Sequence, residues 1–416
     1  MDEVKKTMRK KSLLLILASI LVLSGVLAGC SKGADGGSGG KELKVWLMGD
    51  ETDDTLIKEY EEKNPGVKVS VQSIPWSSAH DKLLTAVASK NGPDVVQMGT
   101  TWIPEFAQAG ALLDLTPYLE QYPNLKQENY FDGAVETMSY EDKVVGIPWY
   151  VETRVLFYRT DLLAEVGYPE GPATWDELKD AGKKLVARGS GNYAMTIDAK
   201  DMNYLAMFAW QNGSQMIDEN RQPHFNEPEF MGAIEYLKSF YDEGLTPKGN
   251  DLELFSSFKD GKIPMFISGP WMITGVKEKA PELEGKWATK TLPAKENNTS
   301  FLGGANLSVF SSSKNVEEAV KFISFMSDKE TQLKNYDVSL NLPAVKSAWE
   351  DQRFEDPLFA TFGKQLENAK PVPFIKEWEA VSQAAIASFE NITVGGADIK
   401  TEMDQLNAKA SEILGK

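Results

Sequence analysis

The chain has 416 residues, of which 42% are apolar, and its formal net charge is −17. This length is enough for two or three ordinary domains or for one large two-lobed structure. The acidic balance argues against a nucleic-acid partner, because such partners are bound by a basic face. It also disfavours electrostatic attachment to an anionic membrane, but it leaves neutral ligands open.

The first 29 residues have the pattern of an export signal. Five basic residues within the first eleven precede an uncharged apolar stretch, Ser12 to Gly29. Cys30 follows directly, and as the only cysteine of the chain it cannot form an internal disulfide. A retained membrane anchor is the alternative, but residues 30–40 are small and polar, as in a flexible tether. We therefore predict a signal peptide at 1–29 and a tether at 30–40.

The ordered part is expected to begin near Lys41 with alternating strands and helices. The strands are predicted at 43–48, 67–74 and 93–99, and amphipathic helices lie between them. This alternation is typical of parallel strands in an α/β sheet, where ligands bind beyond the carboxyl ends of the strands. The residues that follow these strands are Asp50, Trp76, Thr101 and Trp102.

The remainder of the chain is expected to be richer in helix. A helix should begin after Thr174 as its N-cap, and IPMFISGPW predicts a strand that leads into a Gly-Pro turn presenting Trp271. FLGGANLSVF predicts another strand, followed by a helix over NVEEAVKFISFMSD. The last seventy residues are expected to be mostly helical.

The sequence offers little for metal or nucleophilic catalysis. Its two histidines, His80 on the surface of a predicted helix at 77–91 and His224 in a polar loop, have no metal-ligand spacing. Known catalytic motifs are absent, so we predict no cofactor and no enzymatic activity. With 61 Asp and Glu residues, however, a glycosidase-like carboxylate pair remains open at this stage.

The order of several motifs resembles a known family. VWLMGD, GPDVVQMGTTWIPEFAQAGALLDLT, VVGIPWYVETRVLFYRTDLL, FKDGKIPMFISGPW and FLGGANLSV together resemble the extracellular solute-binding proteins of ABC importers, and most nearly their maltose- and oligosaccharide-binding branch. LAGC at Cys30 resembles the bacterial lipobox, in which the cysteine is lipidated. Such lipid anchoring is typical of Gram-positive bacteria, so the resemblance implies a protein on the outer face of the cell membrane.

This resemblance implies a two-lobed α/β fold with a mostly parallel sheet in each lobe and the ligand in the cleft between them. The first lobe would comprise 41–150 and 293–327, and the second 151–292 and 328–416. The lobes would close around the ligand by a hinge motion. The implied partners are a carbohydrate, two permease subunits and an ATPase, and the implied state is a monomer.

Carbohydrate sites combine aromatic faces for C–H surfaces with planar polar groups for hydroxyls. The resemblance implies stacking for Trp271 and Trp378 and polar contacts for Asp50, Glu152 and Asp201. Thr101 and Trp102 stand where maltose-binding relatives carry an Asp–Arg pair, which predicts an additional stacking surface or a different sugar. The further candidates for ligand contact are Trp76, Trp149, Arg154, Gly303, Gly304 and Asn306, with an ion pair to Glu152 as the alternative role of Arg154. A regular strand in this segment would put Tyr150, Glu152 and Arg154 on one face and Trp149 on the other.

Other functions stay open from the sequence alone. A glycerol-phosphodiester-binding protein would share the architecture but needs basic groups in the cleft, where only Arg154 stands out. A surface glycosidase would need a facing pair of carboxylates. A peptide or metal binder is the fourth alternative, and its metal form lacks clustered histidines or cysteines.

Overall fold

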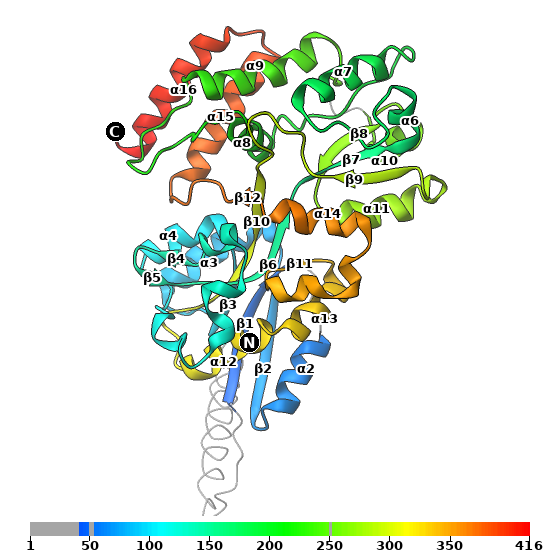
Figure 1. Ribbon diagram of the computed structural model, residues 1–416. Coiled ribbons are helices and arrows are strands. Elements are labelled where there is room, and N and C mark those ends of the chain that lie inside the picture. Colours follow the sequence, from blue (N-terminus) through cyan, green and yellow to red (C-terminus); the bar gives the residue numbers. More distant parts are fainter. Residues whose placement is uncertain (1–40, 50–53, 249–251) are drawn as a thin grey trace, which may run out of the picture. The chain divides into compact units, whose positions relative to one another are not determined.

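The computed structural model describes residues 41–49, 54–248 and 252–416 (Figure 1). The chain divides into two compact units, 1–41 and 42–416, and the second is described below. The predicted signal peptide and tether, Cys30 and Asp50 lie outside the described residues. Among the described helices, none combines the length and the hydrophobicity of a membrane span.

The first lobe is built on a sheet that has seven strands within the described ranges. Their order is β11-β6-β10-β3-β1-β2, and β12 pairs with β10. The strands of this sheet are β1 (Lys41–Met48), β2 (Val67–Ile74), β3 (Val95–Gly99), β6 (Ile147–Thr153), β10 (Ser300–Val309), β11 (Leu342–Pro343) and β12 (Ala369–Lys370). A small hairpin of β4 (Ser139–Tyr140) and β5 (Lys143–Val144) precedes β6 in the chain.

The second lobe contains a three-stranded sheet of order β8-β7-β9 in the described part of the chain. Its strands are β7 (Val155–Arg159), β8 (Met265–Ser268) and β9 (Trp287–Lys290). A single residue, Arg154, separates β6 of the first sheet from β7 of the second. The two sheets are therefore joined directly through β6 and β7.

Helices cover both sheets (Figure 1). The described helices that precede β6 are α2 (Asp54–Lys63), α3 (Trp76–Ser89), α4 (Ile103–Gln108) and α5 (Asp132–Val135). Those that follow β10 directly are α12 (Val316–Met326) and α13 (Lys329–Ser339). Those between β7 and β9 are α6 (Thr160–Glu165), α7 (Trp175–Val186), α8 (Met202–Gln211), α9 (Pro228–Asp242), α10 (Leu254–Lys259) and α11 (Trp271–Lys279). The last three are α14 (Pro357–Leu366), α15 (Trp378–Thr393) and α16 (Ile399–Leu414).

The core of the first lobe forms where α2 and α12 pack together. The ring of Tyr60 lies edge-on to Phe322 at 5.0 Å, and the Tyr60 hydroxyl donates to Glu318 at 2.5 Å. Both rings are fully buried. A buried aromatic side chain contributes a few kcal/mol, about 1.5–3 for Phe, and the hydrogen bond satisfies the one polar atom that Tyr60 brings inside.

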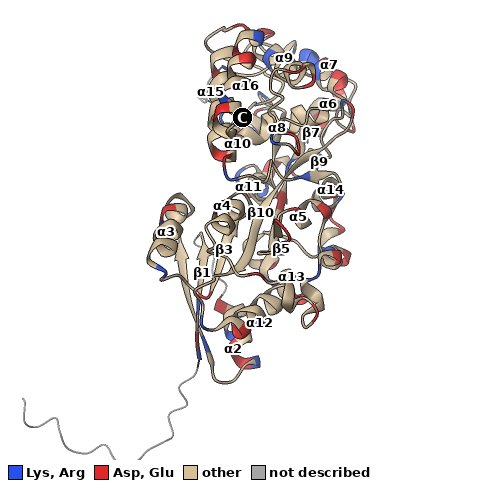
Figure 2. Cartoon of the chain, turned by 90° about the vertical axis from the view of Figure 1, so that its left-hand side faces the viewer, with Lys and Arg blue, Asp and Glu red and all other residues tan. Residues whose placement is uncertain are grey.

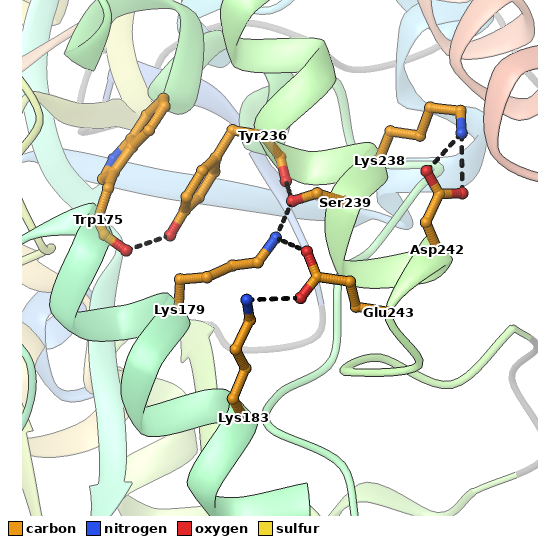
Figure 3. A network of polar contacts seen from close by, with 8 residues as sticks. All are labelled: Trp175, Lys179, Lys183, Tyr236, Lys238, Ser239, Asp242 and Glu243. Carbon is orange, nitrogen blue, oxygen red and sulfur yellow. Dashed lines mark hydrogen bonds and ion pairs between the residues drawn. The ribbon is translucent and has the colours of Figure 1, made fainter.

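The second lobe is held together by packing between α7 and α9, as Figure 3 shows. The rings of Trp175 and Tyr236 stack at 4.2 Å, and the Tyr236 hydroxyl donates to the carbonyl of Trp175 at 2.7 Å. Lys179 and Lys183 both contact Glu243, at 2.9 and 3.0 Å. Because these charges lie near the surface, the aromatic stack contributes more to stability than the ion pairs. α7 begins as predicted, with the Thr174 hydroxyl accepting from the Glu177 N–H.

Charged residues of both signs are intermixed on the helices of the two lobes (Figure 2). On the face shown, acidic residues therefore lie among basic ones, although the whole chain has a net charge of −17. Interspersed charges of this kind keep a protein soluble without marking a binding face.

The predicted two-lobed α/β fold is confirmed, but its sheets are not mostly parallel. β1 and β3 are parallel, with Val45 opposite Val95, as the strand–helix alternation indicates. β10 instead runs antiparallel to both β3 and β6, and β7 runs antiparallel to both β8 and β9. Several helices lie in the chain between the two strands of each of these pairs, and such long separations permit either direction of return. Helix–strand alternation therefore does not determine strand direction there.

The predicted lobe assignment also needs correction after residue 327. β11 extends the first sheet by pairing with β6, and α13 contacts α2 and β11. Residues 328–343 therefore pack with the first lobe, whereas the sequence analysis assigned them to the second. The reason is local, because only two residues separate the end of α12 at Met326 from the start of α13 at Lys329, and the chain stays beside the same sheet.

β6 and β10 approach closely at Gly304. Its φ is +125°, and a Cβ there would lie 2.2 Å from the Tyr150 carbonyl oxygen of β6. Both the backbone conformation and the available space therefore require glycine. We expect Gly304→Ala to lower the free energy of unfolding by about 2–3 kcal/mol or more, measured by urea unfolding with tryptophan fluorescence.

Gly285→Ala is the matched control for this substitution. Gly285 also has a positive φ, +71°, but nothing lies within 4 Å of the added Cβ. Its cost should be that of the left-handed backbone alone, about 1–2 kcal/mol. Equal losses for the two variants would show that the close approach of the strands contributes nothing beyond the backbone conformation.

Candidate ligand-binding site

A cavity of about 500 Å³ lies between the elements of the two lobes. Its first-lobe walls come from the start of α3, the segment after β3, and the strands β6 and β10. Its second-lobe walls come from the starts of α8 and α15. Eight of the predicted site residues line it together: Trp76, Thr101, Trp102, Glu152, Asp201, Gly303, Gly304 and Trp378.

Two tryptophans form an aromatic wall on the first lobe. Trp76 is the first residue of α3, and Trp102 ends the short 3₁₀ helix η1 (Thr100–Trp102) that follows β3. Their ring centroids are 5.5 Å apart, and the ring planes are inclined at 58°. Gly99 lies against both rings, and a Cβ there would be in ordinary van der Waals contact with them, 3.4 Å from Trp76 and 3.5 Å from Trp102. Trp76 is 39% exposed, which is unusual for so large an apolar side chain.

Glu152 lies on the half-exposed face of β6. Tyr150 and Glu152 are partly exposed while Trp149, Val151 and Thr153 are buried, so the predicted alternation of this strand is confirmed. Glu152 is opposite Gly303 of β10, where a Cβ would come within 2.8 Å of the carboxylate. Gly303 thus gives the Glu152 side chain its place in the cavity wall.

Arg154 connects this cavity with its neighbours. Its guanidinium lies 3.5 Å from the Glu152 carboxylate and 4.7 Å above the ring of Trp271. Trp271 is 46% exposed at the start of α11 and lines two adjoining cavities of about 600 and 490 Å³. The first of these shares Asp201 with the main cavity, and the second shares Glu152. Arg154 covers one face of Trp271, and 46% of the Trp271 surface stays exposed to the adjoining cavities and solvent.

Asp201 is the N-cap of α8, where its carboxylate accepts from the Asn203 N–H at 2.9 Å. Burial raises the pKa of this carboxyl above its ordinary value. The Asn203 hydrogen bond and the nearby Arg154 charge act in the opposite direction but do not cancel the effect. The charged form of Asp201 is therefore short of solvation and would gain from additional hydrogen-bond donors.

Trp378 is the first residue of α15 and is only 5% exposed, so it presents an edge rather than an open face. The preceding Glu377 pairs with Arg221 at 2.8 Å, which ties the start of this helix to the loop before α9. Four further cavity residues on α15 were missed in the sequence analysis: Glu379, Ser382, Gln383 and Ile386. Their spacing is helical, so extending the helix face from Trp378 would have found them.

Tyr150 and Phe301 also line the cavity and were missed as candidates. Both lie on the crossing strands, next to predicted residues. Strand alternation from Glu152 points to Tyr150, whereas Phe301 gives no comparable signal in the sequence.

The predictions for Asn306 and Trp149 are corrected. Asn306 is 1% exposed, and its amide donates to the backbone carbonyl of Thr137 at 2.9 Å. A bulge between Ala305 and Asn306 changes the facing of the strand at this point. Trp149 is 5% exposed and packs in the core of the first lobe. Asn306 and Trp149 therefore stabilise the first lobe and do not line the cavity.

Rings and carboxyl groups thus meet in one cavity. In the described ranges, no group of three or more His, Cys, Asp or Glu side chains is placed to hold a metal ion. Aromatic rings beside carboxylates suit a ligand that has both apolar C–H faces and hydroxyl donors. The two-lobed fold with such a cavity between the lobes defines the class of solute-binding proteins.

Comparisons with known proteins agree with this class. Residues 49–333 match the family of bacterial extracellular solute-binding proteins, and the chain belongs to that family. It is 28% identical to the galactooligosaccharide-binding protein of Bacillus subtilis, over 96% of each chain. It is 27% identical to the maltooligosaccharide ABC transporter solute-binding lipoprotein of Streptococcus pneumoniae, over 92% of each. The solved sugar-binding protein MalE of Xanthomonas citri has a TM-score of 0.87 and 31% identity, covering 90% of this chain and 98% of that one.

The raised pKa of Asp201 leads to a pH-dependent prediction. The folded state binds the Asp201 proton more tightly than the unfolded chain, whose ordinary pKa is 3.8. Folding stability therefore falls as the pH rises from that value through the folded-state pKa. We expect Asp201→Asn, which keeps an oxygen for the Asn203 N–H, to be more stable than the parent at pH 7. The gain should vanish below pH 3.8, as measured by urea unfolding across pH.

Asp198→Asn is the control, because Asp198 is an exposed carboxylate in the same loop. It should not reproduce this pH profile. A loss of stability in Asp201→Asn at neutral pH would contradict the interpretation, since it would show that the folded state favours the charged carboxylate.

Proposed function

We propose that this protein captures an oligosaccharide outside the cell and delivers it to an ABC importer. The observation that carries this proposal is that the rings of Trp76, Trp102 and Trp378 meet the carboxyl groups of Glu152 and Asp201 in one cavity. Such a site covers the apolar faces of a sugar and accepts hydrogen bonds from its hydroxyls. The family of the chain and the named ligands of its relatives support a carbohydrate ligand and transporter partners.

The adjoining cavities support an oligosaccharide over a single sugar. The main cavity and the two that share Asp201 or Glu152 with it extend along the same wall. A ligand of several rings can occupy more than one of them, with Trp271 in contact with its distal part.

Closure of the lobes is part of this proposal. β6 continues through Arg154 into β7, while β10 begins at Ser300 beside the second lobe and ends in the first sheet. A rotation about these two crossings would bring α8 and α15 toward the aromatic wall. We place the first lobe at 41–153, 293–350 and 369–370 and the second at 155–292, 351–368 and 371–416.

The proposed location is the outer face of the membrane. A lipid on Cys30 would hold the mature chain there, and the tether at 30–40 would let the binding lobes reach the permease. The lipoprotein relative in Streptococcus pneumoniae supports this. We expect the protein to act as a monomer.

The alternatives receive less support. A phosphodiester would need free cationic groups, but Arg154 already faces Glu152 at 3.5 Å. Among the described residues, the main cavity itself is lined by one lysine, Lys200, which precedes Asp201 in the chain. The charge balance of this cavity thus favours a neutral ligand over an anionic one.

Thermal unfolding of the mature chain without Cys30 tests the proposed ligand. Suitable probes are maltotriose, galactotriose, arabinotriose and diacetylchitobiose, with a glycerol phosphodiester and a peptide for comparison. A probe at a hundredfold excess over its Kd should stabilise the protein by about 2.7 kcal/mol, which appears as a higher Tm. Shifts with the phosphodiester alone would refute the carbohydrate proposal.

Trp271→Ala tests the stacking surface, with the saccharide that most raises the Tm of the parent as the ligand. Loss of a contacting tryptophan should weaken binding by at least about 1 kcal/mol, or roughly fivefold in Kd. Leu84→Ala is the control, because Leu84 is similarly exposed, at 40%, on α3 but does not line the cavity. An unchanged Kd in Trp271→Ala would remove Trp271 from the site while leaving the main cavity as the binding place.

Cys30→Ser tests the anchor. The full chain expressed in a Gram-positive host should incorporate labelled fatty acid and sediment with membranes, because acyl chains bury their CH₂ groups in the bilayer. The serine variant should lose the label. Retention of the label in that variant would exclude Cys30 as the lipid attachment site.

A further inference from the structure

His80 lies beside the aromatic wall, and its side chain stays 36% exposed, in agreement with the predicted position on a helix surface. Trp76 and His80 are four residues apart on α3, so they share a face of that helix. Trp102 and Phe106 have the same spacing across η1 and α4. The His80 ring lies edge-on to both, at 5.4 Å from Trp102 and 5.7 Å from Phe106. The two pairs of side chains thus interlock.

A hydrogen bond fixes the His80 ring in this position. His80 Nε2 lies 2.8 Å from a carboxylate oxygen of Glu105, which belongs to α4. Glu105 precedes Phe106, so one short helix supplies both the polar and the apolar contact of the imidazole. This bond joins α3, which carries Trp76, to α4, which begins directly after Trp102.

We propose that His80 is a positioning residue that sets the orientation of Trp102 in the cavity wall. This inference rests on the proposed function, because it gives His80 its role through the ligand-facing ring. Trp102 has the neighbouring rings of Trp76 on one side and His80 on another. Glu105 aims the imidazole, and the imidazole limits the conformations of the indole.

The expected benefit is preorganisation. A tryptophan that is already held in its stacking orientation loses less conformational entropy when a sugar binds. Without the imidazole, a gap opens beside Trp102, and its ring gains conformations that do not face the cavity. The loss of affinity should be about two- to tenfold, because ordering one side chain typically costs that much.

The first experiment needs no ligand. Near-ultraviolet circular dichroism reports the fixed geometry of neighbouring indoles, so His80→Ala should change the tryptophan bands of the free protein. His80→Phe, which keeps a ring beside Trp102, should largely restore them. His224→Ala is the matched control, because His224 is also 2.8 Å from a glutamate, Glu227, but lies between α8 and α9 and not on the elements that carry Trp76 and Trp102.

The second experiment measures the Kd for the saccharide, among the four probes named above, that most raises the Tm of the parent. His80→Ala should weaken this binding about two- to tenfold in the parent background. It should have little effect in a Trp102→Ala background, since the ring to be positioned is then absent. His80→Phe should recover most of the parental affinity.

Three results would overturn the proposal. These are unchanged tryptophan bands in His80→Ala, an unchanged Kd in the parent background, or an equal loss of affinity with and without Trp102. If none of the probes binds the parent protein, the proposed function fails. The circular dichroism of the free protein still decides whether His80 orients Trp102.

Discussion

The close passage of β10 over β6 is the constraint on which the candidate site depends. Gly304 has a φ of +125° and lies against the Tyr150 carbonyl, and Gly303 leaves space for the Glu152 carboxylate. The same two strands carry Tyr150, Glu152, Gly303 and Gly304 into the cavity wall. They are also the strands at which the two sheets meet. The floor of the binding site and the proposed hinge are therefore one structure, so a movement of the lobes must act on the groups that contact the ligand.

The main cavity and the two that adjoin it hold several groups in environments that do not favour folding. Burial raises the pKa of Asp201, and Trp76 and Trp271 expose 39% and 46% of their surface. Within the described residues, Arg154 Nη1 is buried without a hydrogen bond, although its ion pair with Glu152 is 3.5 Å long. Each feature costs stability in the free protein and would be relieved by a ligand with hydroxyls and apolar faces. Local conflict of this kind, concentrated in one place, is typical of a functional site.

Sequence reasoning identified eight of the nineteen described residues that line the cavity, and those eight have local signals in the sequence. Trp76 and Trp102 follow predicted strands, and the alternation of β6 placed Glu152 correctly on the half-exposed face. Asn306 failed because a bulge, which leaves no clear mark in the sequence, changes the register of β10. The direction of β10 depends on how the chain returns after a long segment, and the position of α13 depends on which sheet the chain stays beside after α12. Those features are decided by tertiary packing, and helix–strand alternation carries no information about them.

The composition of the cavity suggests how selectivity would be divided between the lobes. The first-lobe wall is aromatic, and apolar surfaces discriminate weakly between ligands that differ by one hydroxyl, by about a hundredfold at most. Groups that hydrogen-bond discriminate more strongly, because a mismatched ligand leaves a buried polar atom without a partner. The carboxyl groups of Asp201 and Glu379 belong to the second lobe, and Glu152 lies where the lobes meet. On the proposed function, the first lobe would collect sugars broadly by stacking, and the choice among them would be made when closure brings these carboxyl groups to the hydroxyls.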